Sequence, residues 1–501
     1  MSEIEIKFVT RESALPAFID NVLPVFERAG YSVNREAEMR LQNDYYDTAE
    51  HIFQTAKMGF RVRGFDDKFE QTMKTQGKIS GGLHQRAEYN VDLETAEPDL
   101  RLFPKDVWPD DWQVETVNQD LQRQFSTNFV RTTFNVAWQD ALVEIVVDEG
   151  EAITGKNSSP IREIELELKK GQVADLFTLS QLIVENMPVR LSDVSKAAQG
   201  YQLLNGLSPV ISPMQGYLAL NHGTSTEDAF CKAIQLALSH WQKHEHLFYE
   251  TGSVKMLGEI VKSIRLLLQT VTLYLPVLQC PQLMSVHQLL TRYVQGWLWQ
   301  DDLQSLRYLL SKKSLFNKCL SRYPALLSYL QGRKAGLIHA HHPEELLLNK
   351  QTNRLKLLLS QILHEKPWRD HSRAYDVPVM EHAQGWLAQG WQTVQQTMPA
   401  ARTMTPENYL AIGVLLRQTL WNGFLLADLF DDDRHHFRAP WLDILTGIDE
   451  LKALMMLKAM SQESELDDVT DVFTWIDEKI VSLMSVMERT RQAGMQGDIY
   501  W

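Results

Sequence analysis

The sequence predicts an α+β protein in which a β barrel with a charged interior is followed by an all-α helical bundle. Two observations carry this prediction. Up to about residue 205, short segments alternate apolar and charged side chains, which is the two-residue period of β-strands. From Thr226 almost to the last residue, apolar side chains instead recur with the 3.6-residue period of amphipathic helices.

The two patterns meet in a stretch rich in Pro, Gly, Ser and Thr, which is typical of a domain boundary. A chain of 501 residues is long enough for two domains that each have a core. We therefore expect a barrel domain, a linker and a helical domain at residues 1–205, 206–225 and 226–501.

Composition restricts the class of protein. The chain is 44% hydrophobic and 23% charged, as soluble globular proteins are, and its net charge is −14. Apolar runs such as 271–278 are too short to cross a bilayer, and the first 30 residues lack the pattern of a secretory signal. Three scattered cysteines indicate a reducing compartment. We expect a cytoplasmic protein with no nucleic-acid or membrane partner.

The first strand, residues 3–8, sets the pattern for the barrel. Alternation places Glu3, Glu5 and Lys7 on one face and the apolar residues between them on the other. Residues 163–169 nearly repeat this arrangement, with three glutamates on one face. Because hard divalent cations take oxygen ligands, two such strands that converge would form a cation site.

The other elements of the first domain follow in order. Apolar residues at helical spacing predict a helix over 12–29, and a further helix is expected within the irregular segment 99–126. A last helix is expected over 173–186. Strands are predicted at 40–47, 59–65, 69–74, 86–91, 129–134, 141–148 and 163–169.

Charges of both signs recur on one face of these strands. For any one strand, a solvated face is the commoner explanation, but the repetition favours a barrel that packs its apolar outside against helices and encloses the charges. Buried charges are costly unless they are paired or neutralised by a ligand. A lumen that carries Arg and Lys beside Glu is therefore suited to a polyanion and a divalent metal.

The ordered set of these residues resembles the CYTH, or triphosphate tunnel metalloenzyme, superfamily. Its ExExK signature corresponds to Glu3, Glu5 and Lys7, and the resemblance continues through the charged positions as far as Lys196. The segment 81–86 is similar to bacterial inorganic triphosphatases that join this domain to a helical one. The resemblance implies an eight-stranded antiparallel tunnel that hydrolyses triphosphates with one or two Mg²⁺ or Mn²⁺ ions.

Each charged position then has an expected role. The cationic candidates for substrate binding are Lys7, Arg61, Arg63, Lys74, Arg86, Arg131 and Lys196. The candidate metal ligands are Glu3, Glu5, Asp148, Glu163, Glu165 and Glu167. The catalytic candidates are Lys7, Glu88 and Lys196, with Glu88 either supporting a ligand or positioning water.

Several assignments stay open at this level. Glu163, Glu165 and Glu167 share a face, so the sequence does not say which two of them bind metal. The residues 45–47 are as well suited to a turn as to ligand contact, and His84 is expected to be structural.

The second domain is predicted to be a helical bundle similar to the CHAD domains, which the resemblance associates with inorganic polyphosphate. Thirteen of the 15 histidines lie between His222 and His436. The stretch 312–373 holds 12 Lys and Arg against 4 Asp and Glu, which suits an anionic polymer. Helices are predicted at 229–250, 255–275, 285–299, 301–310, 314–330, 342–365, 377–397, 406–429, 441–461 and 469–491.

The first functional prediction is the metal-dependent hydrolysis of inorganic triphosphate to pyrophosphate and phosphate. One alternative is a polyphosphate-binding or scaffold protein without turnover. The other is a tunnel enzyme that acts on an organic triphosphate such as thiamine triphosphate or a nucleoside triphosphate. The first 205 residues lack a clear aromatic or amide cluster for a base, which favours the inorganic substrate.

Overall fold

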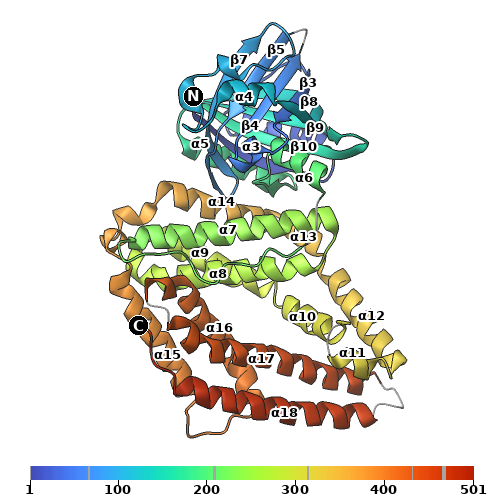
Figure 1. Ribbon diagram of the computed structural model, residues 1–501, viewed down its shortest axis with the longest axis vertical. Coiled ribbons are helices and arrows are strands. Elements are labelled where there is room, and N and C mark those ends of the chain that lie inside the picture. Colours follow the sequence, from blue (N-terminus) through green and yellow to red (C-terminus); the bar gives the residue numbers. More distant parts are fainter. Residues whose placement is uncertain (1, 66–67, 207–209, 313–314, 431–432, 465–469) are drawn as a thin grey trace. The chain divides into compact units, whose positions relative to one another are not determined.

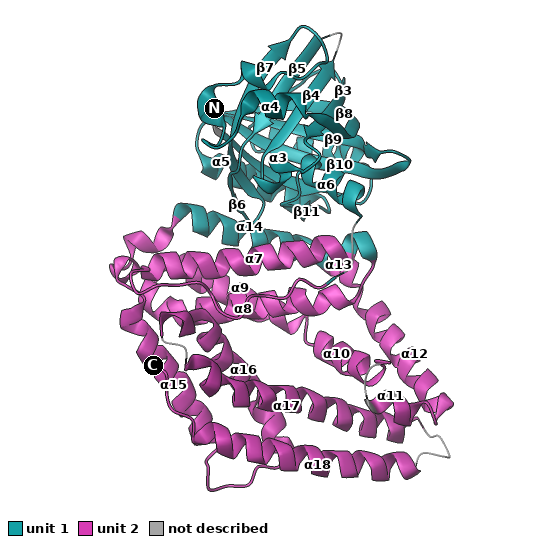
Figure 2. Ribbon diagram, in the orientation of Figure 1, with its two compact units in different colours: residues 1–210, 249–251, 347–365 teal, residues 211–248, 252–346, 366–501 magenta. Residues whose placement is uncertain are grey.

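The computed structural model describes residues 2–65, 68–206, 210–312, 315–430, 433–464 and 470–501. It divides into two compact units, which Figure 2 shows in different colours. The barrel unit comprises residues 1–210, 249–251 and 347–365. The helical unit comprises residues 211–248, 252–346 and 366–501.

Eight antiparallel strands close the barrel, in the spatial order β1-β10-β9-β8-β3-β4-β5-β7, with β7 pairing back to β1. Three short strands, Ser32–Arg35 (β2), Lys78–Ser80 (β6) and Arg190–Leu191 (β11), extend the sheet. The barrel strands are β1 (Ser2–Val9), β3 (Met39–Asp47), β4 (Gly59–Phe65), β5 (Lys68–Lys74), β7 (Leu83–Leu93), β8 (Gln122–Trp138), β9 (Ala141–Thr154) and β10 (Asn157–Lys170).

The outside of the barrel carries its hydrophobic core. Ile6 and Phe8 of β1 are fully buried there together with Ile164 and Leu166 of β10. Helical segments cover this face: α1 (Ala14–Ala17), a π-helix (Phe18–Val22), α2 (Leu23–Arg28) and α5 (Val173–Asn186). The charged residues that alternate with these apolar ones must then point into the lumen. The predicted fold, an antiparallel barrel with a charged interior followed by helices, is confirmed.

The segment between β7 and β8 covers a second part of the outer surface. Leu100, Phe103 and Val107 pack with Phe60 of β4 and Met73 of β5. Two 3₁₀-helices, Leu100–Leu102 and Lys105–Val107, precede α4 (Val114–Gln119). The prediction of an irregular segment up to residue 126 was too long, because β8 already begins at Gln122. Another short helix, α3 (Ile52–Thr55), lies between β3 and β4.

One helix from late in the chain belongs to the barrel unit. In α14 (Lys350–Glu365), Leu357 joins the outer core of the barrel and is 5% exposed. Asn353 accepts a hydrogen bond from the Leu191 backbone N–H at 3.1 Å. Ser360 donates one to the carbonyl of Gly81 at 2.8 Å. The barrel is therefore completed by a segment far from it in sequence.

The helical unit is built from long helices (Figure 1). Its apolar clusters include the following two. One cluster packs side chains of α15, α16, α17 and α18 together, and the other joins α10, α11 and α12 to α17 and α18. The helices are α7 (Thr226–Thr251), α8 (Lys255–Leu278), α9 (Pro281–Gln295), α10 (Trp299–Leu309), α11 (Leu315–Leu320), α12 (Pro324–His341), α13 (Pro343–Leu348), α15 (Met380–Thr397), α16 (Pro406–Leu426), α17 (Arg434–Glu463) and α18 (Thr470–Met495).

Two of the predicted helices are interrupted in the structure. The one over 314–330 is two helices, and the second begins at Pro324, whose missing N–H is harmless only in a first turn. The one over 342–365 is also broken, between α13 and α14. The predicted helix 285–299 ends at Gln295, and α10 starts at Trp299.

Two helices have the length and composition of a membrane span, Lys255–Leu278 and Pro406–Leu429. In each, 61% of the most apolar window is buried inside the protein, as in the core helices of many folded domains.

Candidate active site

The lumen of the barrel gathers the charged residues that the sequence singled out. β1 lies between β10 and β7, with Lys7 opposite Glu165 and Glu3 opposite Arg86. Glu3, Glu5 and Lys7 are each at most 9% exposed. Alternation on β1 thus turns three ionic side chains inward while the intervening residues form the outer core.

A carboxylate cluster, formed by Asp148 of β9 with Glu163 and Glu165 of β10, lies in this lumen. Each of the three contributes a carboxylate oxygen within 4.8 Å of the other two. Lys196, the first residue of α6 (Lys196–Asn205), places its Nζ 2.8 Å from Asp148, 2.6 Å from Glu163 and 3.0 Å from Glu165. Lys7 Nζ lies 3.1 Å from Glu163 and 2.8 Å from Glu165. Two ammonium groups therefore offset part of the negative charge of the three carboxylates.

The electrostatics keep this cluster ionised. Burial alone would raise the pKa of Glu165, but Lys196 and Lys7 outweigh it and hold that pKa well below its usual range. Burial also opposes the charge on Lys196, yet Asp148 and Glu163 raise its pKa well above the usual value. At Lys7, burial likewise opposes the charge, but Glu163 and Glu165 outweigh it and raise the pKa. Glu165, Lys196 and Lys7 are therefore charged at neutral pH.

Arg131 of β8 adds a planar cation to the cluster. Its Nε and one Nη donate to the two oxygens of Asp148 at 2.8 and 2.7 Å, a bidentate contact. Its Nη also lies 3.5 Å from Glu165. Phe129 lies beneath both Arg131 and Lys196, whose charged groups are 5.7 and 5.2 Å from the ring centroid.

A second ionic group surrounds the start of β1. Lys74 Nζ is 2.8 Å from Glu3 and 2.9 Å from Glu88, while Arg86 contacts Glu3 at 3.2 Å and Glu5 at 2.9 Å. Burial favours the neutral form of Glu88, but Lys74 and the nearby Arg61 lower its pKa to about 2. For Glu3 burial prevails and the pKa is raised.

Arg61 and Arg63 of β4 differ from the other lumen cations because they have no close carboxylate partner among the described residues. Arg63 Nε donates to Asn43 Oδ1 at 2.8 Å, and within the described parts of the chain it forms no ion pair. Burial, with Arg61 and Arg131 nearby, lowers the pKa of Arg63 to about 9. Arg61 reaches Glu88 only at 4.0 Å. This side of the lumen has positive charge in excess, which suits an anion.

Glu167 lies apart from the carboxylate cluster. It shares the lumen face of β10, where its Cα is opposite Glu5, but its carboxylate contacts Lys169 at 2.8 Å. Lys169 also reaches Glu144 at 3.2 Å. Of the three glutamates that the sequence could not separate, Glu163 and Glu165 are the two that join Asp148.

Some contributors to the lumen were missed by sequence reasoning. Asn43 is fully buried and links Arg63 to Thr127, whose Oγ1 is 3.0 Å from its amide nitrogen. Phe129 was read only as part of a strand. The signal was present, because the alternation that turns Arg131 inward also turns Phe129 and Thr127 inward.

The tyrosine–aspartate segment and His84 have structural contacts. Asp47 is fully buried and accepts hydrogen bonds from the backbone of Phe53 and from the Tyr201 hydroxyl at 2.6 Å. Tyr45 stacks on Phe125. His84 Nε2 lies 3.3 Å from a backbone carbonyl, and burial lowers its pKa to about 4.

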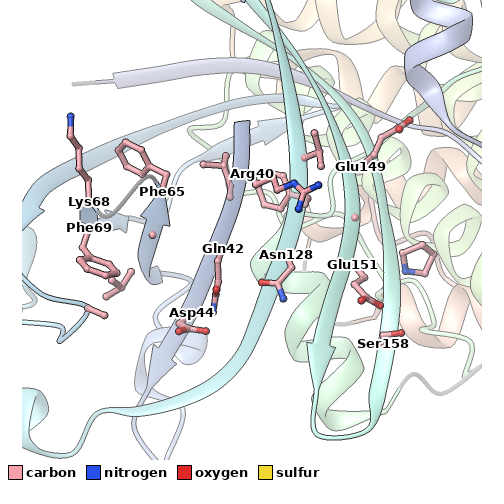
Figure 3. Close-up of a pocket in the computed structure, with 18 residues that line it drawn as sticks. Arg40, Gln42, Asp44, Phe65, Lys68, Phe69, Asn128, Glu149, Glu151 and Ser158 are labelled. Atoms are coloured by element: carbon pink, nitrogen blue, oxygen red, sulfur yellow. The ribbon is translucent and has the colours of Figure 1, made fainter. Parts of the chain in front are cut away.

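A separate pocket of about 1000 Å³ lies on the barrel wall (Figure 3). Its polar lining comes from Arg40, Gln42, Asp44, Asn128, Glu149 and Glu151. These polar residues alternate along their strands with lumen residues such as Asn43 and Asp148, so they lie on the outer face of the sheet, whereas Leu41 and Phe129, which also line the pocket, belong to its inner face. The pocket lining carries both positive and negative side chains, and none of the predicted site residues lines this pocket.

Comparisons with known proteins agree with this geometry. The CYTH domain family model matches residues 1–201. An inorganic triphosphatase of Haemophilus influenzae is 33% identical over 245 residues, which are 48% of this chain and 67% of that relative.

Two solved structures are also similar to parts of the chain. The CHAD domain from the plant Ricinus communis is 12% identical with a TM-score of 0.46, and the match covers 58% of this chain and 99% of that one. A Hippeastrum protein described as revealing a dominant triphosphatase activity is 20% identical with a TM-score of 0.31, covering 40% and 95%. On the family match and the Haemophilus relative, the chain belongs to the CYTH family of inorganic triphosphatases.

Proposed function

We propose that this protein hydrolyses inorganic triphosphate to pyrophosphate and phosphate inside the barrel, in the domain predicted at residues 1–205. The observation that carries the proposal is the asymmetry of the lumen. Two arginines with excess positive charge, Arg61 and Arg63, stand on one wall, and a cluster of ionised carboxylates occupies another. A polyanion would neutralise the two arginines, and a divalent cation would pair with the carboxylates.

Substrate binding is assigned to the cationic side chains. Guanidinium groups bind phosphate oxygens in a bidentate manner, so Arg61 and Arg63 are the first candidates for the phosphate chain. Lys74, Arg86 and Arg131 are paired with carboxylates in the absence of ligand. They would share their donors with phosphate when the substrate enters.

Metal binding is assigned to Asp148, Glu163 and Glu165, with Glu3, Glu5 and Glu167 as further candidates. The cluster offers oxygen donors only, which fits Mg²⁺ or Mn²⁺ better than a softer ion. When bound, such an ion neutralises phosphate oxygens and activates water for attack. Lys7 and Lys196 contact these carboxylates, and an ion bound there would replace some of the lysine–carboxylate contacts.

Lys7, Lys196 and Glu88 are assigned to the chemistry itself. The two lysines keep the cluster ionised in the lumen and supply point charges for phosphate oxygens. Glu88, with a pKa of about 2, is fully ionised at neutral pH. It therefore accepts hydrogen bonds, which suits the orientation of an attacking water, and it does not serve as a proton donor.

The helical domain is a less defined part of the proposal. Binding of polyphosphate there stays a prediction, supported by the basic composition of residues 312–373. Several of these basic groups are already engaged, since Arg369 pairs with Glu227 at 2.6 Å and Arg354 with Glu185 at 3.4 Å. Lys356 is buried. Lys313 lies outside the described residues. We place the activity in the cytoplasm, since the three cysteines are free thiols.

The experiment is phosphate release by the purified protein from tripolyphosphate, with Mg²⁺, with Mn²⁺ and with a chelator. ATP, thiamine triphosphate and long-chain polyphosphate are compared in parallel. The proposal expects metal-dependent turnover that is fastest on tripolyphosphate. Faster turnover of ATP or thiamine triphosphate would favour an organic substrate. Tight binding without turnover of any substrate would favour a polyphosphate-binding protein.

A further inference from the structure

Two histidines and a glutamate meet between the first two long helices of the helical unit. His240 and His244 are one turn apart on α7, so they share a face of that helix. Glu259 lies at the start of α8, and its Oε2 is 2.8 Å from His240 Nε2. The two imidazole rings are 4.2 Å apart between centroids. The three residues offer ligand atoms that all lie within 4.8 Å of one another.

The hydrogen bonds of His244 fix which ring nitrogen carries the proton. His244 Nδ1 is 2.8 Å from the backbone carbonyl of His240, which can only accept, so Nδ1 carries the hydrogen. Nε2 then has a free lone pair. The side chain is fully buried, and Nε2 has no hydrogen-bond partner within the residues that the structure describes. Buried polar atoms normally have a partner, and a bound ion would supply one for this lone pair.

The same hydrogen bond also sets the orientation of the His244 ring. Metal-ligating histidines commonly donate their other ring N–H to a backbone carbonyl, which orients the ring. His244 makes this contact through Nδ1.

We propose that His240, His244 and Glu259 form a binding site for a transition-metal ion of the zinc class. Two imidazole nitrogens and one carboxylate oxygen are a common three-ligand set for Zn²⁺, which leaves a fourth position for water or an incoming ligand. Histidines at i and i+4 on one helix face present their nitrogens to a single ion. The nitrogen donors separate this site from the all-oxygen cluster of the barrel, which suits Mg²⁺ or Mn²⁺.

A simple buried ion pair explains less of the geometry. The His240–Glu259 contact satisfies those two residues alone and leaves His244 Nε2 unused. Lys262 is also near Glu259, and its Nζ lies 3.7 Å from Oε2 on a side chain that is 41% exposed. Bound metal would replace the His240–Glu259 hydrogen bond with two metal–ligand bonds and link α7 to α8.

The test is a calorimetric titration of the chelator-treated, full-length protein with Zn²⁺ in excess Mg²⁺, which is included to fill the oxygen cluster that the proposed function assigns to Mg²⁺. His244→Ala, His240→Ala and Glu259→Ala are compared with His287→Ala. His287 lies in the same unit and bonds to Thr272 Oγ1 at 3.1 Å, outside the proposed site. We expect one Zn²⁺ per chain in the parent and in His287→Ala, with at least about tenfold weaker binding in each of the three site variants.

Equal Zn²⁺ binding by the parent and His244→Ala would overturn the proposal. If a site variant fails to fold, the parent protein still provides a test through Co²⁺. A four-coordinate site with nitrogen ligands gives Co²⁺ visible absorption bands that Zn²⁺ then removes. A spectrum indistinguishable from aqueous Co²⁺ would also overturn the proposal. Neither readout depends on triphosphate turnover, so the barrel activity and this site are tested separately.

Discussion

Arg63 and Arg131 face the same lumen but have opposite surroundings. Arg131 holds the fully buried Asp148 through two hydrogen bonds, whereas Arg63 contacts an uncharged amide. Burying a cation without a counter-ion is unfavourable for folding, and a bound anion would supply the missing counter-charge to Arg63. We therefore expect Arg63 to matter mainly for ligand binding, and Arg131 to matter for both ligand binding and stability.

The first prediction compares Arg63→Ala with Arg131→Ala. We expect Arg63→Ala to lower kcat/KM for tripolyphosphate about tenfold or more, because a charged phosphate contact is lost. The free energy of unfolding should change little. Arg131→Ala should lower the unfolding free energy by about 3 kcal/mol, because Asp148 loses its bidentate partner in the interior. Steady-state kinetics and denaturant unfolding measure both, and an equal loss of stability in the two variants would contradict this division.

The second prediction concerns pH and Glu88. Its pKa is lowered from 4.5 to about 2, so its ion pairs stabilise the folded state fully above pH 4.5. That contribution, up to about 3 kcal/mol, is lost as the pH falls toward 2. Glu88→Gln should therefore be less stable than the parent at pH 5, and the gap should shrink by pH 3. Denaturant unfolding at both pH values gives the difference, and a constant gap would rule this out.

At the scale of elements, α6 delivers Lys196 to the carboxylate cluster and must approach the barrel closely. Gly200 of α6 faces the ring of Phe125, and a methyl group at this position would clash with that ring. Tyr201 also packs on Phe125, with ring centroids 5.1 Å apart. The position of Lys196 thus depends on a glycine in the helix that carries it.

The third prediction is that Gly200→Ala displaces α6 and lowers both turnover and thermal stability. Gly385→Ala in α15 is the matched control, because nothing lies within 4 Å of its added methyl group. Replacing glycine in an open helix position stabilises by about 0.5–1 kcal/mol. Thermal unfolding and phosphate release are measured on both. Unchanged turnover in Gly200→Ala would show that the position of α6 does not matter.

The sequence predicts features that depend on neighbouring residues better than features that depend on the pairing of distant segments. Alternation on β1 and β10 is a local property, so the inward charges and the outer core could be predicted. The register between strands is not a local property. Pairing of β9 with β10 places Glu163 opposite Asp148, whereas Glu167 lies opposite Glu144 and contacts Lys169, outside the cluster. Sequence alone does not bring Glu259 to His240 and His244, because their meeting requires the packing of α7 on α8.

At the scale of the whole molecule, the two compact units do not follow the order of the chain. α14 lies far along the sequence but contributes Leu357 to the core of the barrel. No local pattern could predict this, since α14 has the same helical period as its neighbours. The barrel therefore needs a segment beyond residue 205 to cover its outer surface.

The fourth prediction is that Leu357→Ala destabilises the barrel by about 2–5 kcal/mol, the usual cost of deleting a buried leucine. Leu442→Ala, at a position that is 45% exposed on α17, should have little effect. Limited proteolysis of the barrel strands, read by mass spectrometry, reports on each variant. Equal protection of the barrel in both variants would mean that α14 is dispensable for it.

Whether the carboxylate cluster is the site of catalysis is tested by comparing Glu165→Gln with Glu151→Gln in Mg²⁺-dependent release of phosphate from tripolyphosphate. Glu165 belongs to the carboxylate cluster, and Glu151 is an exposed glutamate on the outer wall. We expect Glu165→Gln to lose turnover by about a hundredfold or more while the fold is kept, and Glu151→Gln to match the parent. Full turnover in Glu165→Gln would place the chemistry outside the lumen cluster and contradict the account.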